Sequence, residues 1–132
     1  MSIRTLTDLV KTRLSGDWWQ VYTGEVPSDP PSGYVTIYPS PGNATSENLA
    51  DSQNRLRWTV RLVCSGYGSE QAMDVADATR NLMTRWQPYP NDPSASRFRE
   101  VDEDAPLLPD RTVPGDIRFS LTLVYRLYTN RS

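Results

Sequence analysis

The chain has 132 residues, of which 37% are hydrophobic and 11 are prolines. This length predicts one domain, residues 1–132, that buries roughly two thirds of the surface of the unfolded chain. The formal net charge of -2 and a pI near 5.1 argue against a free-standing nucleic-acid binder, because such proteins usually carry an excess of basic residues.

Hydrophobic residues recur at helical spacing near the start of the chain and predict a short amphipathic helix over residues 3–15. Trp18–Thr23 is a possible strand, and Tyr34–Tyr38 is a compact β-rich stretch. Residues 43–54 are polar and without periodicity, so we expect a long loop or a hairpin arm there.

Two long alternating segments dominate the sequence. Arg55–Ser65 carries hydrophobic residues at its even positions, and Ile117–Tyr128 carries them at its odd positions. Arginines and hydroxyl residues fill most of the other positions. Because side chains alternate between the two faces of a strand, each segment predicts a strand with one buried and one solvent-facing side.

A second amphipathic helix is predicted between these strands, with Ser69 as its N-cap and Pro88 after its end. Its buried stripe is predicted to consist of Ala72, Ala76, Thr79, Leu82, Met83 and Trp86. A short strand over Arg97–Asp102 and an acidic, proline-rich loop over Glu103–Gly115 should follow before the last long strand, residues 116–129.

The order α-β-β-β-α-β-β predicts the α+β class. We expect a mostly antiparallel sheet of four to five strands, two helices packed on one of its faces, and long proline-rich loops.

The sequence offers little catalytic chemistry. It contains no histidine, which removes the commonest general base and most zinc sites. Gly66-Tyr67-Gly68 lies where a dinucleotide fingerprint would lie, but Gln71 replaces the third glycine, so we assign these glycines to a turn. The single cysteine, Cys64, falls on a hydrophobic strand face and should be a small buried residue. We therefore predict no enzyme activity, no metal and no cofactor.

The N-terminal residues lack the hydrophobic core of a secretion signal, and no hydrophobic run approaches the roughly 18 residues of a membrane span. We therefore expect the protein to be made, and first to act, in a cytoplasm.

Three sequence blocks resemble the tail-terminator proteins of long-tailed bacteriophages: "VYTGEVPSDPPSGYVTIYPSPG" (21–42), "RLRWTVRLVCSGYGSEQAMDVADATRNLM" (55–83) and "DIRFSLTLVYRLYT" (116–129). The resemblance covers nearly the whole chain and extends to the fold of the lambda tail terminator. It implies a virion protein, assembled in the host cytoplasm, that forms a ring, usually a hexamer. Such a ring caps the tail tube, ends its polymerisation and joins the head. Head–tail connector and stopper proteins are similar in size and remain an alternative.

A ring of identical subunits needs one surface that binds a different surface of the next copy. We hypothesise that arginines on the solvent-facing side of the sheet pair across subunits with carboxylates around Glu100–Asp104 and at Asp110. The arginines are Arg57, Arg61, Arg118 and Arg126, and the carboxylates are Glu100, Asp102, Glu103, Asp104 and Asp110.

Three alternatives remain open from the residues alone. The same arginines could line a channel through which DNA passes. The tryptophans and tyrosines could form a platform for a single-stranded nucleic acid. The acidic loop could serve a small hydrolase.

Overall fold

The computed structural model describes residues 3–15, 19–26, 33–41, 43–45, 55–91, 95–101, 108–113 and 116–130. The elements, in chain order, are α1 (Ile3–Leu14), β1 (Gln20–Thr23), β2 (Gly33–Pro39), β3 (Asn43–Thr45), β4 (Arg55–Gly66), α2 (Ser69–Met83), β5 (Arg99–Glu100), β6 (Leu108–Val113) and β7 (Asp116–Asn130). The predicted α+β class is confirmed.

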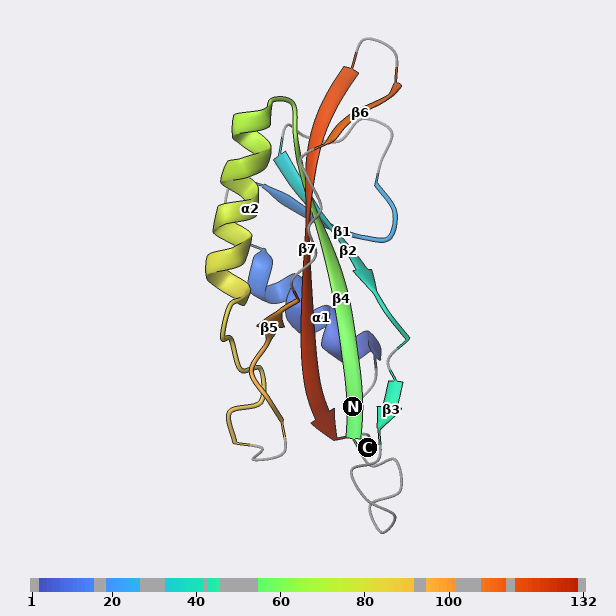
Figure 1. The fold of residues 1–132 in the computed structure, drawn as a ribbon, viewed down its shortest axis with the longest axis vertical. Helices are drawn as coiled ribbons and strands as arrows, with labels where there is room; N and C mark the ends of the chain where they lie inside the picture. The colour runs from blue at the N-terminus through green and yellow to red at the C-terminus, as the bar shows by residue number, and fades with distance from the viewer. Residues whose placement is uncertain are drawn as a thin grey trace.

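The described strands form one sheet with the order β1-β2-β4-β7-β5 (Figure 1). The short strand β3 pairs with one end of β4, and β6 pairs with one end of β7. All of these pairings are antiparallel except that of β1 with β2, which is parallel. The sheet is therefore mostly antiparallel, as predicted, with its two longest strands side by side at the centre.

Both α1 and α2 pack on the same face of the sheet, which we call the covered face. The alternation of β4 explains this arrangement, because Trp58, Val60, Leu62 and Cys64 all point to that face and are inaccessible to solvent. Leu123, Tyr125 and Leu127 of β7 continue the core in register with them. Buried residues of the helices complete it: Leu6, Val10 and Leu14 from α1, and Val75, Ala76 and Met83 from α2.

The second helix is shorter than predicted. It ends at Met83, and Arg85 adopts a left-handed backbone with φ of 62°. After this break the chain pairs with a distant segment: Arg85 N–H donates to the Phe98 carbonyl at 3.2 Å, and Phe98 N–H donates to the Trp86 carbonyl at 2.8 Å. The Trp86 ring stacks on that of Phe98, with the two ring centroids 5.4 Å apart. The prediction that Trp86 belongs to the helix is wrong, although its ring still packs against the core.

The start of α2 also differs by one residue. Gly68 is the N-cap and Ser69 is the first helical residue, with no side-chain capping bond. Gln71 closes the turn instead, because its Oε1 accepts a hydrogen bond from Tyr67 N–H at 2.9 Å. A Cβ at Gly66 would lie 2.9 Å from the Ala72 backbone nitrogen. The glycine at this position therefore lets the helix start directly against the end of β4, which confirms its assignment to turn geometry.

Two short strands occur in segments predicted as loops. Leu108–Val113 forms β6 within the region predicted as an acidic loop, and Asn43–Thr45 forms β3 within the predicted arm. Both pair with the ends of strands that are longer than their neighbours. These segments form strands because the ends of β4 and β7 offer backbone hydrogen-bonding groups to pair with, and not because their own residues have a high β propensity.

Candidate interaction surface

The face of the sheet opposite to α1 and α2, which we call the distal face, carries the polar positions of β4 and β7. The register places Arg61 beside Val124, Thr59 beside Arg126 and Arg57 beside Tyr128. Tyr38 of β2 lies beside Arg61 on the other side of β4. The prediction that these arginines share one side of the sheet is therefore confirmed for Arg57, Arg61, Arg118 and Arg126.

The distal face is not uniformly open, contrary to the sequence-based expectation. At the end formed by the start of β7, Thr36 is only 2% exposed, Ser65 4% and Arg118 6%. The guanidinium carbon of Arg118 lies 3.8 Å from the centroid of the Tyr67 ring and 5.2 Å from that of Tyr34. Arg118 is thus held by cation–π contacts inside its own subunit.

The other end of the distal face is more accessible. Arg61 is exposed, Arg57 and Arg126 are half-buried, and Tyr38 is 44% exposed. Sequence reasoning missed a further member, Arg99 of β5, which is exposed and pairs in register with Arg126. We call Arg57, Arg61, Arg99 and Arg126 the arginine patch.

The pairing of Arg99 with Arg126 has an electrostatic cost in the isolated subunit. Arg99 and Arg126 are direct cross-strand neighbours, and like charges in that position destabilise a sheet. The Nε of Arg126 is buried and has no hydrogen-bond partner among the residues that the structure describes. A hollow of about 220 Å³ lies next to them, lined by Arg99, Glu100, Val101, Arg126 and Tyr128. A negatively charged hydrogen-bond acceptor bound here would offset the repulsion between Arg99 and Arg126 and could accept a hydrogen bond from Arg126 Nε.

Glu100, a predicted partner of these arginines, lies elsewhere. Its backbone is in register with Tyr125, so its carboxylate points to the covered face. There Arg80 Nε donates to Glu100 Oε1 at 2.8 Å, and Tyr125 OH donates to the same oxygen at 3.3 Å. The hydrogen bond that Arg80 donates to Glu100 raises the pKa of Arg80, and burial raises the pKa of Tyr125. Glu100 therefore ties β5 to α2.

The remaining predicted carboxylates cannot be placed in the same way. Asp102, Glu103 and Asp104 lie outside the described residues. The backbone of Asp110 belongs to β6 and pairs with that of Arg118. Pairing between these four residues and arginines of a neighbouring subunit stays a prediction.

Cys64 behaves as a structural residue. It is inaccessible to solvent, and burial raises the pKa of its thiol to about 12. A thiolate is the reactive form of cysteine, so this environment opposes nucleophilic chemistry.

The described residues contain no cluster of three or more Cys, Asp or Glu side chains placed to hold a metal ion. Within the same parts of the chain, neither helix is long and hydrophobic enough to cross a membrane.

Comparisons with known proteins give a likeness in structure but none in sequence. No protein-family model matches the sequence, and no curated protein does. Among solved structures, a chain from the "Virion of native gene transfer agent (GTA) particle" matches with 19% sequence identity and a TM-score of 0.49, covering 98% of this chain and 92% of that chain. A likeness at this level assigns no family to the chain.

Proposed function

We propose that this protein is a structural component of a phage-type virion, and specifically a tail terminator that forms a ring, usually of six copies, on the end of the tail tube. The ring ends tail polymerisation and offers the surface for head joining. The partners are other copies of the chain, the tail-tube protein and a head–tail connector or stopper. DNA only passes through the ring, and no cofactor or catalysis is involved. The protein is assembled in the host cytoplasm and resides in the virion.

One observation supports the proposal beyond the sequence resemblance: the two faces of the sheet differ, because helices cover one face and arginines lie on the other. Both helices seal the covered face within one subunit, while the distal face carries the arginine patch, in which Arg61 and Arg99 are exposed and Arg57 and Arg126 are half-buried. Arginine is well suited to bidentate contacts with carboxylates, and such contacts fix register and partner choice. The chain supplies 16 acidic residues for such contacts.

A head–tail connector or stopper, which is similar in size, remains the alternative within the same class. A single-stranded nucleic-acid module is less well supported. Trp58 and Tyr125, two aromatic residues of the long strands, are inaccessible to solvent and cannot stack on bases.

Native mass spectrometry and sedimentation velocity over a range of concentrations test the proposal, with the protein alone and mixed with the tail-tube protein. We expect one closed oligomer with a fixed copy number that binds the end of assembled tubes. A chain that stays monomeric at all concentrations, even with tail tubes present, would refute ring formation. If the oligomer binds the head and not the tail tube, the result would favour the connector.

A further inference from the structure

We propose that the arginine patch of one copy binds the exposed face of helix α2 of the next copy. This inference rests on the proposed function, because it names the two surfaces that meet within the ring. It differs from the sequence-based hypothesis, in which the carboxylates were those around Glu100–Asp104 and Asp110.

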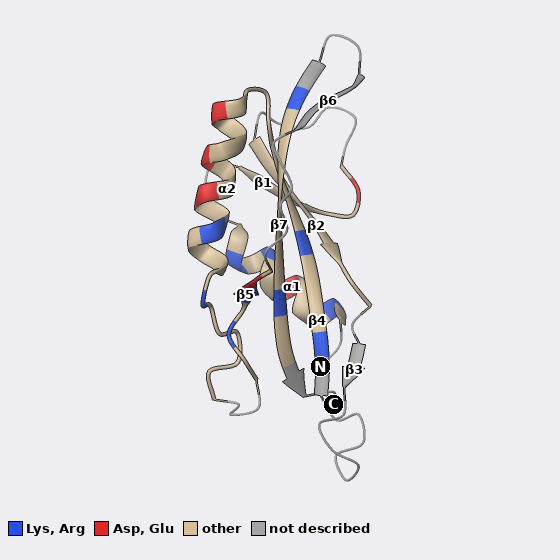
Figure 2. Cartoon of the chain, in the orientation of Figure 1, with Lys and Arg blue, Asp and Glu red and all other residues tan. Residues whose placement is uncertain are grey.

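The exposed face of α2 carries a row of carboxylates, the acidic stripe: Glu70, Asp74 and Asp77. Their spacing of four and three residues places them one above the other on one side of the helix. All three are exposed, on the side of α2 that faces away from the sheet. Figure 2 shows the two sets of charges apart, acidic positions along α2 and basic ones along β4 and β7.

The dimensions of the two surfaces correspond. Seven residues of helix separate Glu70 from Asp77, which is about 10 Å at 1.5 Å per residue. Arg57 and Arg61 are four residues apart on one strand, about 13 Å at 3.3 Å per residue. Arg99 lies two strands from β4, about 10 Å away at the usual strand spacing. A helix lying along β4 can therefore bring its three carboxylates within reach of several guanidinium groups at once.

Each surface also has an exposed hydrophobic residue next to its charges. Among the described residues, the large hydrophobic side chains that are exposed are Tyr38, Tyr67 and Met73. Tyr38, at 44% exposed, lies beside Arg61, and Met73, at 43%, lies on α2 between Glu70 and Asp74. Methionine sulfur makes favourable contacts with aromatic rings, and interfaces combine a hydrophobic centre with a polar rim.

A groove lies beside the acidic stripe, so this surface is not flat. It has a volume of about 350 Å³ and runs between α2 and β7, with Met73 and Asp77 on its helix side and Leu121–Val124 on its strand side. The paired side chains of Arg80 and Glu100 also line it.

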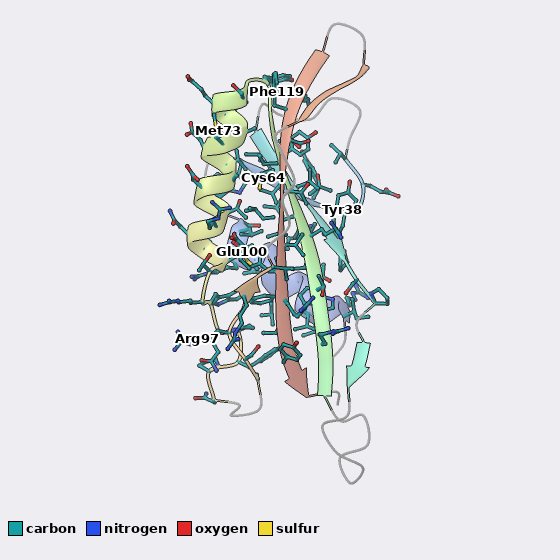
Figure 3. All side chains as sticks on the ribbon, in the orientation of Figure 1. Tyr38, Cys64, Met73, Arg97, Glu100 and Phe119 are labelled. Atoms are coloured by element: carbon teal, nitrogen blue, oxygen red, sulfur yellow. The ribbon has the colours of Figure 1, made fainter. Side chains whose placement is uncertain are left out.

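The two surfaces cannot meet within one subunit. α2 packs on the covered face, whereas the arginine patch lies on the distal face, and Figure 3 shows Met73 and Tyr38 on opposite sides of the molecule. The contact is therefore between copies and heterologous, so that each copy offers one surface to either neighbour. Repeating such a contact gives a closed ring when the rotation between copies closes, and a filament when it does not.

A charge-reversal experiment on the full chain tests the contact. The stripe-reversed variant carries Asp74→Arg and Asp77→Arg, and the patch-reversed variant carries Arg61→Glu and Arg99→Glu. Matched controls are Asp8→Arg and Arg4→Glu, which reverse exposed charges on α1. Circular dichroism confirms that each variant is folded, and native mass spectrometry with sedimentation velocity measures assembly.

We expect each reversed variant alone to require a concentration roughly 100-fold higher for half-assembly, at roughly 10-fold for each reversed charge in a close pair. The controls should assemble like the wild type. An equimolar mixture of the two reversed variants should assemble again, because the arginines of one variant then meet the carboxylates of the other at every contact.

Other outcomes separate this inference from the proposed function. If the wild type forms rings and both reversed variants do so equally well, the proposed contact is wrong, but the proposal of a ring is supported. If both variants fail alone and their mixture also fails, the two surfaces do not bind each other. If the wild type forms only filaments or dimers that depend on these charges, the inference holds and the ring is wrong. If patch reversal abolishes binding of linear duplex DNA but leaves assembly unchanged, the patch is a nucleic-acid surface.

Discussion

Replacing Trp58 by alanine probes the part of the fold on which both surfaces depend. Trp58 is inaccessible to solvent in the first half of β4. Its Nε1–H donates a hydrogen bond to the Ser40 carbonyl at 3.0 Å, and its ring meets the edge of Phe98 with the centroids 6.1 Å apart. The side chain thus joins β4 both to the end of β2 and to the segment that leads into β5.

The expected loss of stability follows from these contacts. Truncating a fully buried tryptophan to alanine costs about 3–5 kcal/mol, including the cavity that remains. Loss of the hydrogen bond to Ser40 adds about 1 kcal/mol. The total, about 4–6 kcal/mol, is comparable to the whole stability of a small domain, which is about 5–15 kcal/mol. Trp58→Ala should therefore leave the chain partly or wholly unfolded at 25 °C.

Urea denaturation followed by far-UV circular dichroism measures this loss. The matched variant Trp58→Phe retains a ring that can contact Phe98 but lacks the Nε1–H donor, so it should lose only about 2 kcal/mol. If Trp58→Ala costs less than about 1.5 kcal/mol, the ring is not packed as the structure places it, and the core assignment fails.

Three other predictions follow from single contacts. Gly66→Ala should cost about 1–3 kcal/mol in urea denaturation, because the new Cβ would meet the backbone of Ala72 at 2.9 Å. Gly68→Ala, where a Cβ meets nothing within 4 Å, should change stability by less than about 1 kcal/mol. Glu100→Gln should also cost less than about 1 kcal/mol, since the Arg80 and Glu100 side chains are 50% and 38% exposed; a larger loss would show that the pair is desolvated. Because the pKa of Cys64 is raised from 9.0 to about 12, its thiol should resist iodoacetamide in the folded protein at pH 9 and react on unfolding. The unfolded chain releases this proton first, so stability should fall as pH rises from about 9 towards 12, and less steeply in Cys64→Ala.

Periodicity was sufficient to predict the central architecture. Strict alternation along β4 and β7 identified both strands and assigned Trp58 and Tyr125 to the buried face, because one face of a half-buried strand must be hydrophobic throughout. The hydrophobic stripe of α2 similarly predicted which side of the helix meets the sheet. These signals are local and repeat many times, so single exceptions do not obscure them.

Features that depend on tertiary contact could not be predicted in this way. The parallel pairing of β1 with β2 leaves no trace in either strand. The burial of Arg118 depends on Tyr34 and Tyr67, which approach it from a different strand and from the turn before α2. Alternation correctly gave the face on which Arg118 lies, but it cannot report that aromatic rings cover one end of that face.

The short strand β5 shows how a small structural detail decides the charge of a surface. Arg99 and Glu100 are adjacent, so they point to opposite faces, and a shift of one residue in the pairing with β7 would exchange them. The observed register is held by Phe98, which is 1% exposed in the core, and by Val101 N–H, which donates to the Val124 carbonyl at 2.7 Å. In this register the arginine joins Arg126 on the distal face and the carboxylate joins Arg80 on the covered face. The alternative register would place a carboxylate within the arginine patch and neutralise part of it. The packing of Phe98 and the hydrogen bond of Val101 therefore decide which charge β5 adds to the surface that we propose to bind the next copy.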